Sequence, residues 1–182
     1  EISACLVGSE MCIRDRSVEE KTELKELQAY LLPYLEDDLV CSMNDHIQHG
    51  TTTTLQHCLS VMYASCAFAS RLHLRVNYRD LAVGALLHDF YLYDWHHHQE
   101  KKGSLHGFSH PYMACRNAKR HFQINRKVQH IIRCHMWPLT FRHMPHSREA
   151  VIVCMVDKYC STLETLAGFW YQFQIRYIRR KI

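Results

Sequence analysis

Glycine and proline are scarce in this chain of 182 residues, which contains six glycines and four prolines. No alternation of apolar and polar residues persists long enough to indicate a sheet of β-strands. A G-x-S-x-G turn, a glycine-rich phosphate-binding loop and a dinucleotide-binding fingerprint are all missing, which removes the easiest competing classes of enzyme. The scarcity of glycine and proline and the lack of a strand pattern predict an all-α protein.

Cysteine pairs with the spacing of a zinc or redox site are also missing. The chain has nine cysteines, an odd number, and none stands in a C-x-x-C arrangement. Most lie in apolar stretches, where a free cysteine behaves as a small hydrophobe, so we expect free thiols and a cytoplasmic protein. The most apolar run, residues 58–70, is too short to span a bilayer, and no membrane partner is expected.

The composition is that of an ordinary globular protein, with 22% charged and 47% hydrophobic residues. A chain of this length suits one domain with one core. The formal charge of +4 suits a small anionic substrate slightly better than a cationic partner. The basic end, residues 176–181, is expected to be solvated, and nucleic-acid binding there is the less favoured alternative.

The first 16 residues stand apart from the rest. Residues 6–16 resemble a translated sequencing adaptor, and the segment lacks the cationic start, apolar stretch and cleavage site of a secretory signal. We expect a non-native or disordered leader, with a frayed natural terminus as the alternative. The predicted single domain then covers residues 17–182.

Capping residues and prolines divide this domain into helices. Ser17 opens a capping box for a first helix that is expected to end before Pro33. Asn77 and Ser147 are expected N-caps, and Pro111 is expected in the first turn of a helix. Helices are predicted over about residues 17–32, 34–46, 51–72, 111–122 and 126–137, with two more that begin after Asn77 and Ser147, and a polar loop over residues 94–109.

Three of these helices carry a metal-capable residue on an apolar face. His88, His135 and Asp157 each end a row of apolar residues spaced by three and four positions. A lone histidine there is usually a satisfied core residue, but burying an unpaired carboxylate costs several kcal/mol. A shared divalent metal would satisfy all three side chains, because neutral imidazole and ionised carboxylate are both metal ligands.

The adjacent pair His88-Asp89 adds a second indication. Neighbours on a helix point about 100° apart, so both side chains reach one centre only where the end of the helix lies against it. With His57 before the pair and Asp157 after it, the chain shows an ordered H…HD…D series.

This series resembles the HD superfamily, whose fold is a helical bundle and whose four signature residues bind a divalent metal. The resemblance covers about residues 51–164 and implies an all-α, single-domain HD-type bundle. It is strengthened by the segments A-L-L-H-D at 85–89, H-G-F-S-H-P at 106–111 and H-M-W-P-L at 135–139.

Superfamily members with two further histidines between the HD pair and the last aspartate hold two metals, bridged by the aspartate of the pair. The gaps here, 21 residues from Asp89 to His110 and 25 from His110 to His135, resemble theirs. His110 is favoured over its alternative, His106, because Pro111 is expected to fix it at a helix start. The resemblance thus implies one metal on His57, His88, Asp89 and Asp157, and a second on Asp89, His110 and His135.

Two chemistries follow from such a centre. Metal-dependent phosphohydrolases activate a water, whereas mixed-valent di-iron oxygenases of the superfamily cleave a C–C or C–P bond, and the six ligands fit both. Hydrolysis is the commoner chemistry, so we expect a phosphohydrolase acting on a small anionic, phosphorylated substrate. Iron or manganese is expected, with magnesium or zinc as alternatives. A non-catalytic binding module is the remaining alternative.

Two residues are expected to take part in catalysis. Asp89 is the expected bridging ligand. Lys158, directly after Asp157, is placed to contact a substrate phosphate or carboxylate, and a solvated helix lysine is the alternative interpretation.

Overall fold

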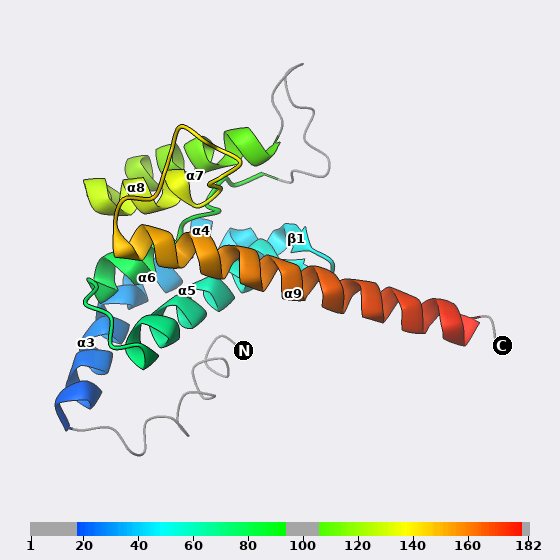
Figure 1. The fold of residues 1–182 in the computed structure, drawn as a ribbon, viewed down its shortest axis with the longest axis horizontal. Coiled ribbons are helices and arrows are strands. Elements are labelled where there is room, and N and C mark those ends of the chain that lie inside the picture. The colour runs from blue at the N-terminus through cyan, green and yellow to red at the C-terminus, as the bar shows by residue number, and fades with distance from the viewer. Residues whose placement is uncertain (1–17, 94–105, 180–182) are drawn as a thin grey trace.

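The computed structural model describes residues 18–93 and 106–179, so the predicted leader lies outside the described residues. These residues form α-helices with one small hairpin, which confirms the all-α prediction (Figure 1). In chain order the elements are α3 (Val18–Leu35), α4 (Asp38–Ser42), the 3-10 helix η1 (Met43–Asp45), β1 (Ile47–His49), β2 (Thr52–Thr53), α5 (Thr54–Arg71), α6 (Tyr78–Leu86), α7 (His106–Phe122), α8 (Arg126–Cys134) and α9 (Arg148–Arg179).

The core is built around α5 and α6, which pack on each other. α9 packs along α5, while α8 lies between α6 and α7. α6 and α8 approach closely at Gly84, where a Cβ atom would lie only 2.7 Å from a side-chain carbon of Ile131. This close approach brings together the C-terminal ends of the two helices, which His88 and His135 closely follow.

Side-chain caps begin the helices that carry the site. Thr53 caps α5 in a capping box with Gln56. The side chain of Asn77 accepts a hydrogen bond from the backbone of Asp80, and that of Ser147 accepts one from Ala150. Both predicted N-caps are thereby confirmed.

The prediction that Pro33 ends the first helix is wrong. α3 continues to Leu35, because Tyr34 and Leu35 pack against the core while Pro33 is exposed. The proline therefore costs one backbone hydrogen bond on the solvent side. The predicted helix over residues 34–46 is replaced by the short α4 and η1, and Asp37 caps α4.

The prediction that Pro111 opens a helix is also wrong. α7 begins at His106, so Pro111 lies inside it, and the last four residues of the predicted loop belong to the helix. Because Pro111 has no amide hydrogen, α7 lacks the hydrogen bond that residue 111 would otherwise donate to the carbonyl of Gly107. Residues 94–105 of that loop lie outside the described part of the chain.

A hairpin that the sequence did not predict precedes α5. β1 and β2 pair antiparallel, with Ile47 opposite Thr53, and Gly50 turns between them with a φ of 60°. The strands are too short to show an alternating pattern. The hairpin matters because it places Gln48 in the interior.

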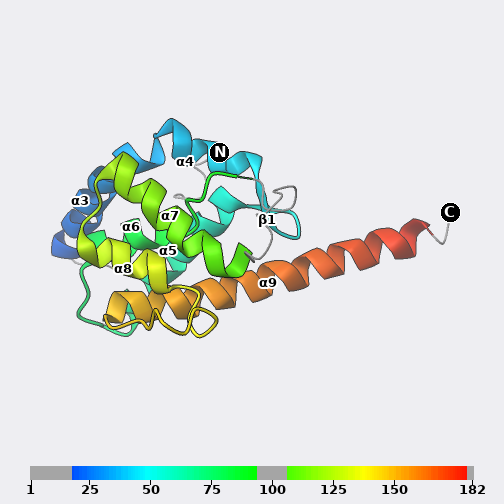
Figure 2. The ribbon, with the colours of Figure 1, turned by 90° about the horizontal axis from the view of Figure 1, so that it is seen from above.

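α9 is longer than expected and runs for 32 residues. Figures 1 and 2 both show its C-terminal part extending past the other helices. Among the described residues, no helix combines the length and the apolar character needed to cross a membrane.

Candidate metal centre

Six metal-capable side chains from five parts of the chain meet in the interior. α5 carries one, the turn after α6 carries two, and α7, the end of α8 and α9 each carry one. Every one of them is buried, with at most 6% of its surface exposed. The six residues are those that the sequence singled out: His57, His88, Asp89, His110, His135 and Asp157.

The carboxylate of Asp89 lies at the middle of this cluster, and its two oxygens face different groups. Oδ2 lies 3.4 Å from Nε2 of His88 and 4.0 Å from Nε2 of His57. Oδ1 lies 3.3 Å from Nε2 of His110 and 3.5 Å from Nε2 of His135. Asp89 is therefore the one side chain shared by two sets of imidazoles.

Asp157 completes the first set. Its Oδ1 atom lies 3.2 Å from Nε2 of His57 and 3.6 Å from Nε2 of His88. The potential ligand atoms of His57, His88 and Asp89 all lie within 4.8 Å of one another, and so do those of Asp89, His110 and His135. Each set has the size and the N/O chemistry of a divalent-metal site.

The outer nitrogens of three rings are held by acceptors. Nδ1 of His88 donates to the carbonyl of Ala85, and Nδ1 of His135 donates to that of Ile132, each at 2.7 Å. Nδ1 of His57 lies 2.9 Å from a carboxylate oxygen of Glu164. Because these acceptors take the Nδ1 proton, the Nε2 lone pair of each neutral ring points into the cluster.

Two buried polar atoms in the cluster have no hydrogen-bond partner among the described residues: Nε2 of His88 and Oδ1 of Asp89. A buried polar atom without a partner is costly. Both atoms are natural ligand atoms, and each belongs to a set that a cation would satisfy. The residues present therefore fit a divalent metal.

The charges in the cluster are strongly coupled. Burial opposes ionisation of Asp89, but the imidazoles of His88 and His110 hold the pKa of its carboxyl below the usual range. Burial disfavours protonation of His57, yet the hydrogen bonds that its ring donates to the carboxylates of Asp157 and Glu164 raise its pKa to about 10. At His135 burial dominates, and it lowers the pKa to about 3. An ionised Asp89 and a neutral His135 are the forms that bind a metal.

Sequence reasoning missed Gln48 and Glu164. The side-chain amide of Gln48 donates to Oδ2 of Asp89 at 2.6 Å. The hydroxyl of Tyr91 in turn donates to the side-chain carbonyl oxygen of Gln48. No pattern pointed to Gln48, because its strand was not predicted. Glu164 had a signal, since it lies seven positions after Asp157 on the same face of α9.

Lys158 lies beside Asp157, with its Nζ atom 4.0 Å from Oδ2 of that residue. Nζ donates to the carbonyls of His135 and Cys154, at 2.7 and 3.1 Å. Lys158 thus ties the end of α8 to α9, and its contact with a substrate stays a prediction. The side chain of the alternative ligand His106 lies outside the described residues.

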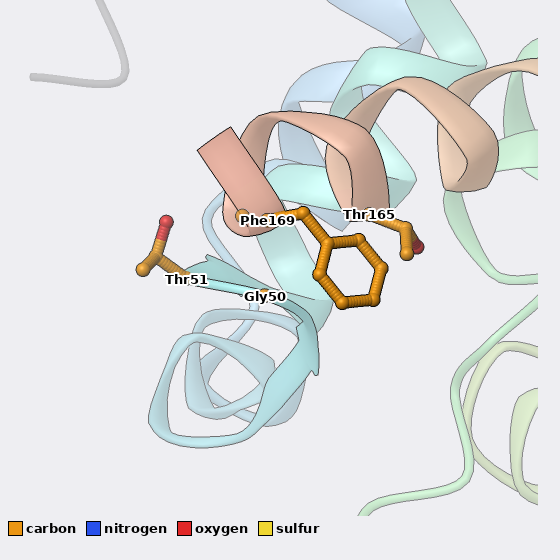
Figure 3. Close-up of a pocket in the computed structure, with 5 residues that line it drawn as sticks. Gly50, Thr51, Thr165 and Phe169 are labelled. Carbon is orange, nitrogen blue, oxygen red and sulfur yellow. The ribbon is translucent and has the colours of Figure 1, made fainter. Parts of the chain in front are cut away.

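A small hollow of about 220 Å³ opens between the hairpin turn and α9 (Figure 3). Thr165 and Phe169 of α9 line one side, and Gly50 and Thr51 line the other. None of the six buried side chains lines it, so we assign no substrate to it.

Comparison with known proteins gives one match. A family model described as HD domain matches residues 54–162, which is more than half of the chain. Neither the curated proteins nor the solved structures that were compared give a match. The matched segment begins at the first residue of α5 and ends within α9, so it contains all six of the buried side chains.

Proposed function

The chain belongs to the HD domain family, and we propose that it is a metal-dependent phosphohydrolase with a dinuclear centre. The observation that carries the proposal is the position of Asp89, whose two carboxylate oxygens face separate sets of imidazoles. A carboxylate in this position is suited to bridge two cations. Two-metal sites of this kind stabilise both the attacking and the leaving oxygen of a phosphoryl group.

The two sets of side chains indicate which residues would hold each metal ion. His57, His88 and Asp157 would hold one metal together with Asp89, and His110 and His135 would hold the other, again with Asp89. When bound, the cations supply a nucleophilic water at neutral pH and neutralise charge on the phosphoryl group. Iron and manganese suit this set of imidazole and carboxylate ligands best, and magnesium or zinc are alternatives.

Neighbouring groups orient these ligands. The backbone carbonyls of Ala85 and Ile132 and the carboxylate of Glu164 fix the rings of three histidines. Gln48 fixes one oxygen of Asp89. Because the cluster is buried, bulk water is excluded, which strengthens each electrostatic interaction with an anionic substrate. A small phosphorylated substrate, such as a phosphate ester or a nucleotide, is the proposed class.

The proposal is tested by a screen for phosphate release. Metal-loaded protein would be incubated with a panel of nucleotides and phosphate monoesters, next to Asp89→Ala and to Asp38→Ala as a control at an exposed position of α4. We expect phosphate release that Asp89→Ala abolishes and Asp38→Ala keeps. Dioxygen consumption and a mixed-valent iron signal without phosphate release would instead assign the centre to the oxygenases of the superfamily.

A further inference from the structure

The face of α9 that points away from the helical bundle carries large apolar side chains. Soluble helices normally present polar residues on that side. Six such side chains are between 40% and 67% exposed: Val151, Met155, Tyr159, Leu163, Leu166 and Trp170.

The opposite face of the same helix is buried. Val153, Val156 and Cys160 pack in the core, and Asp157 and Glu164 point toward the metal centre from the same side. At about 100° per residue, the exposed residues lie roughly half a turn away from these buried ones. α9 therefore has two apolar faces, and the bundle covers one of them.

The exposed residues also follow a regular repeat. From Tyr159 onward the steps are 4, 3 and 4 residues, to Leu163, Leu166 and Trp170. The sequence continues the repeat with steps of 3 and 4, to Phe173 and Tyr177. Apolar residues that recur every 3.5 residues on average are the a and d positions of a coiled coil. A helix that packs on a globular bundle does not need its apolar residues to recur every 3.5 residues.

The position of this segment agrees with the repeat. Figures 1 and 2 show the C-terminal part of α9 running beyond the other helices. A single helix in water is marginal at lengths below roughly 12–15 residues, and most helix stability in proteins comes from packing of an apolar face. Packing on the exposed stripe would supply that stability.

The apolar area is sufficient for a stable interface. Tyr159 and Trp170 are each about two-thirds exposed. Since such side chains bury about 150–250 Å² each, the two leave roughly 270 Å² in water. With the four aliphatic residues of the stripe added, the area reaches roughly 600 Å², which is what each partner buries at the lower end of standard interfaces.

We propose that a second copy of this chain covers the stripe, with α9 packed against α9 in a two-fold symmetric dimer. A second copy carries the identical heptad repeat, and interlocking of a and d residues requires the same spacing on both helices. Two-fold dimers are the commonest homo-oligomers. The interface lies on the side of α9 opposite to Asp157 and Glu164, so each subunit keeps its own metal centre.

The test is the mass of the full chain in solution, measured by sedimentation velocity and light scattering over a range of micromolar concentrations. We expect twice the chain mass of 21.6 kDa for the wild type. Leu163→Glu/Leu166→Glu should be monomeric with unchanged helical circular dichroism and metal content. Leu72→Glu, at an equally exposed leucine at the end of α5, should remain dimeric.

Two results would overturn the proposal. One is a wild type that is monomeric at all concentrations. If that monomer binds anionic lipid vesicles through Leu163 and Leu166, the stripe is a lipid-binding surface instead. The other is a dimer that persists in the double glutamate variant. If the double glutamate variant misfolds, Leu163→Ala/Leu166→Ala replaces it. We expect this variant to raise the Kd of the dimer roughly tenfold or more, and an unchanged Kd would count against the proposal.

Discussion

A carboxylate oxygen of Glu164 lies 2.9 Å from Nδ1 of His57, although 107 residues separate them in the chain. His88 and His135 are oriented by carbonyls of their own helices, only three residues away. Of these three rings, that of His57 is oriented by a charged side chain from another element. The pair joins α5 to α9 at the first metal set, and it delivers a negative charge to one ligand without occupying a coordination position.

Replacing Glu164 with glutamine should weaken metal binding at the first set. The amide oxygen of Gln still accepts the Nδ1 proton, but the negative charge that strengthens the ligand is lost. We expect a roughly 10–100-fold lower affinity for one of the two metals, measured by competition with a chelator. Glu36→Gln, at an exposed position after α3, is the control. An unchanged affinity in Glu164→Gln would show that Glu164 has no role in binding.

Removing the amide of Gln48 should destabilise the protein around Asp89. In Gln48→Leu the carboxylate of Asp89 loses a hydrogen bond of 2.6 Å, and the buried hydroxyl of Tyr91 loses its hydrogen bond to Gln48 while it keeps its contact with Thr54. We expect a loss of roughly 1–3 kcal/mol in the free energy of unfolding, measured with urea on metal-free protein. Tyr91→Phe should cost less, because it leaves the hydrogen bond from Gln48 to Asp89 in place. An equal loss in both variants would contradict this account of the network.

His110→Ala should reduce the metal content from two ions per chain to one. His110 contacts the second set only, with its Nε2 atom 3.3 Å from Oδ1 of Asp89 and 2.9 Å from Nε2 of His135. His121→Ala, an exposed position on the same helix, is the matched control and should keep both ions. If His106→Ala removed an ion while His110→Ala did not, the ligand would have to be reassigned to His106.

Stability of the metal-free protein should fall as the pH rises above neutrality. Carboxylates raise the pKa of His57 to about 10 and that of His88 above the ordinary value of 6.5, despite burial. The folded state therefore holds protons that the unfolded state has lost. This stabilisation is complete below pH 6.5 and is lost as the pH rises toward the folded pKa.

The expected slope is on the order of 1 kcal/mol per pH unit between about pH 6.5 and 7.5, below the range where thiols ionise. It is measured by urea unfolding at each pH. Metal-loaded protein should show little slope in the same range, because bound metal replaces these protons. A flat profile for the metal-free protein would contradict the protonation states assigned to His57 and His88.

Patterns within single helices made much of this structure predictable. Asn77 and Ser147 begin helices because their side chains accept backbone hydrogen bonds, a local property that needs no partner. The apolar rows ending in His135 and Asp157 indicated which face of each helix is buried, and both side chains are buried. Such features depend on residues a few positions apart, so one sequence is enough to find them.

Features that depend on packing between distant segments were not predictable. Pro33 and Pro111 should have ended or begun helices by local rules, but packing of their neighbours keeps both inside. Gln48 reaches Asp89 from a hairpin too short to leave a pattern. The pairing of His57 with Glu164 depends on how α9 lies along α5, which no local rule fixes.

The most direct test of the shared carboxylate is the number of metal ions bound by anaerobically purified protein, counted by native mass spectrometry beside Asp89→Ala. The arrangement of Asp89 between two sets of imidazoles predicts two ions per chain in the wild type. Asp89→Ala should hold at most one, with its helical circular dichroism largely intact. A single ion in the wild type, or two ions retained in Asp89→Ala, would contradict a dinuclear centre bridged by this residue.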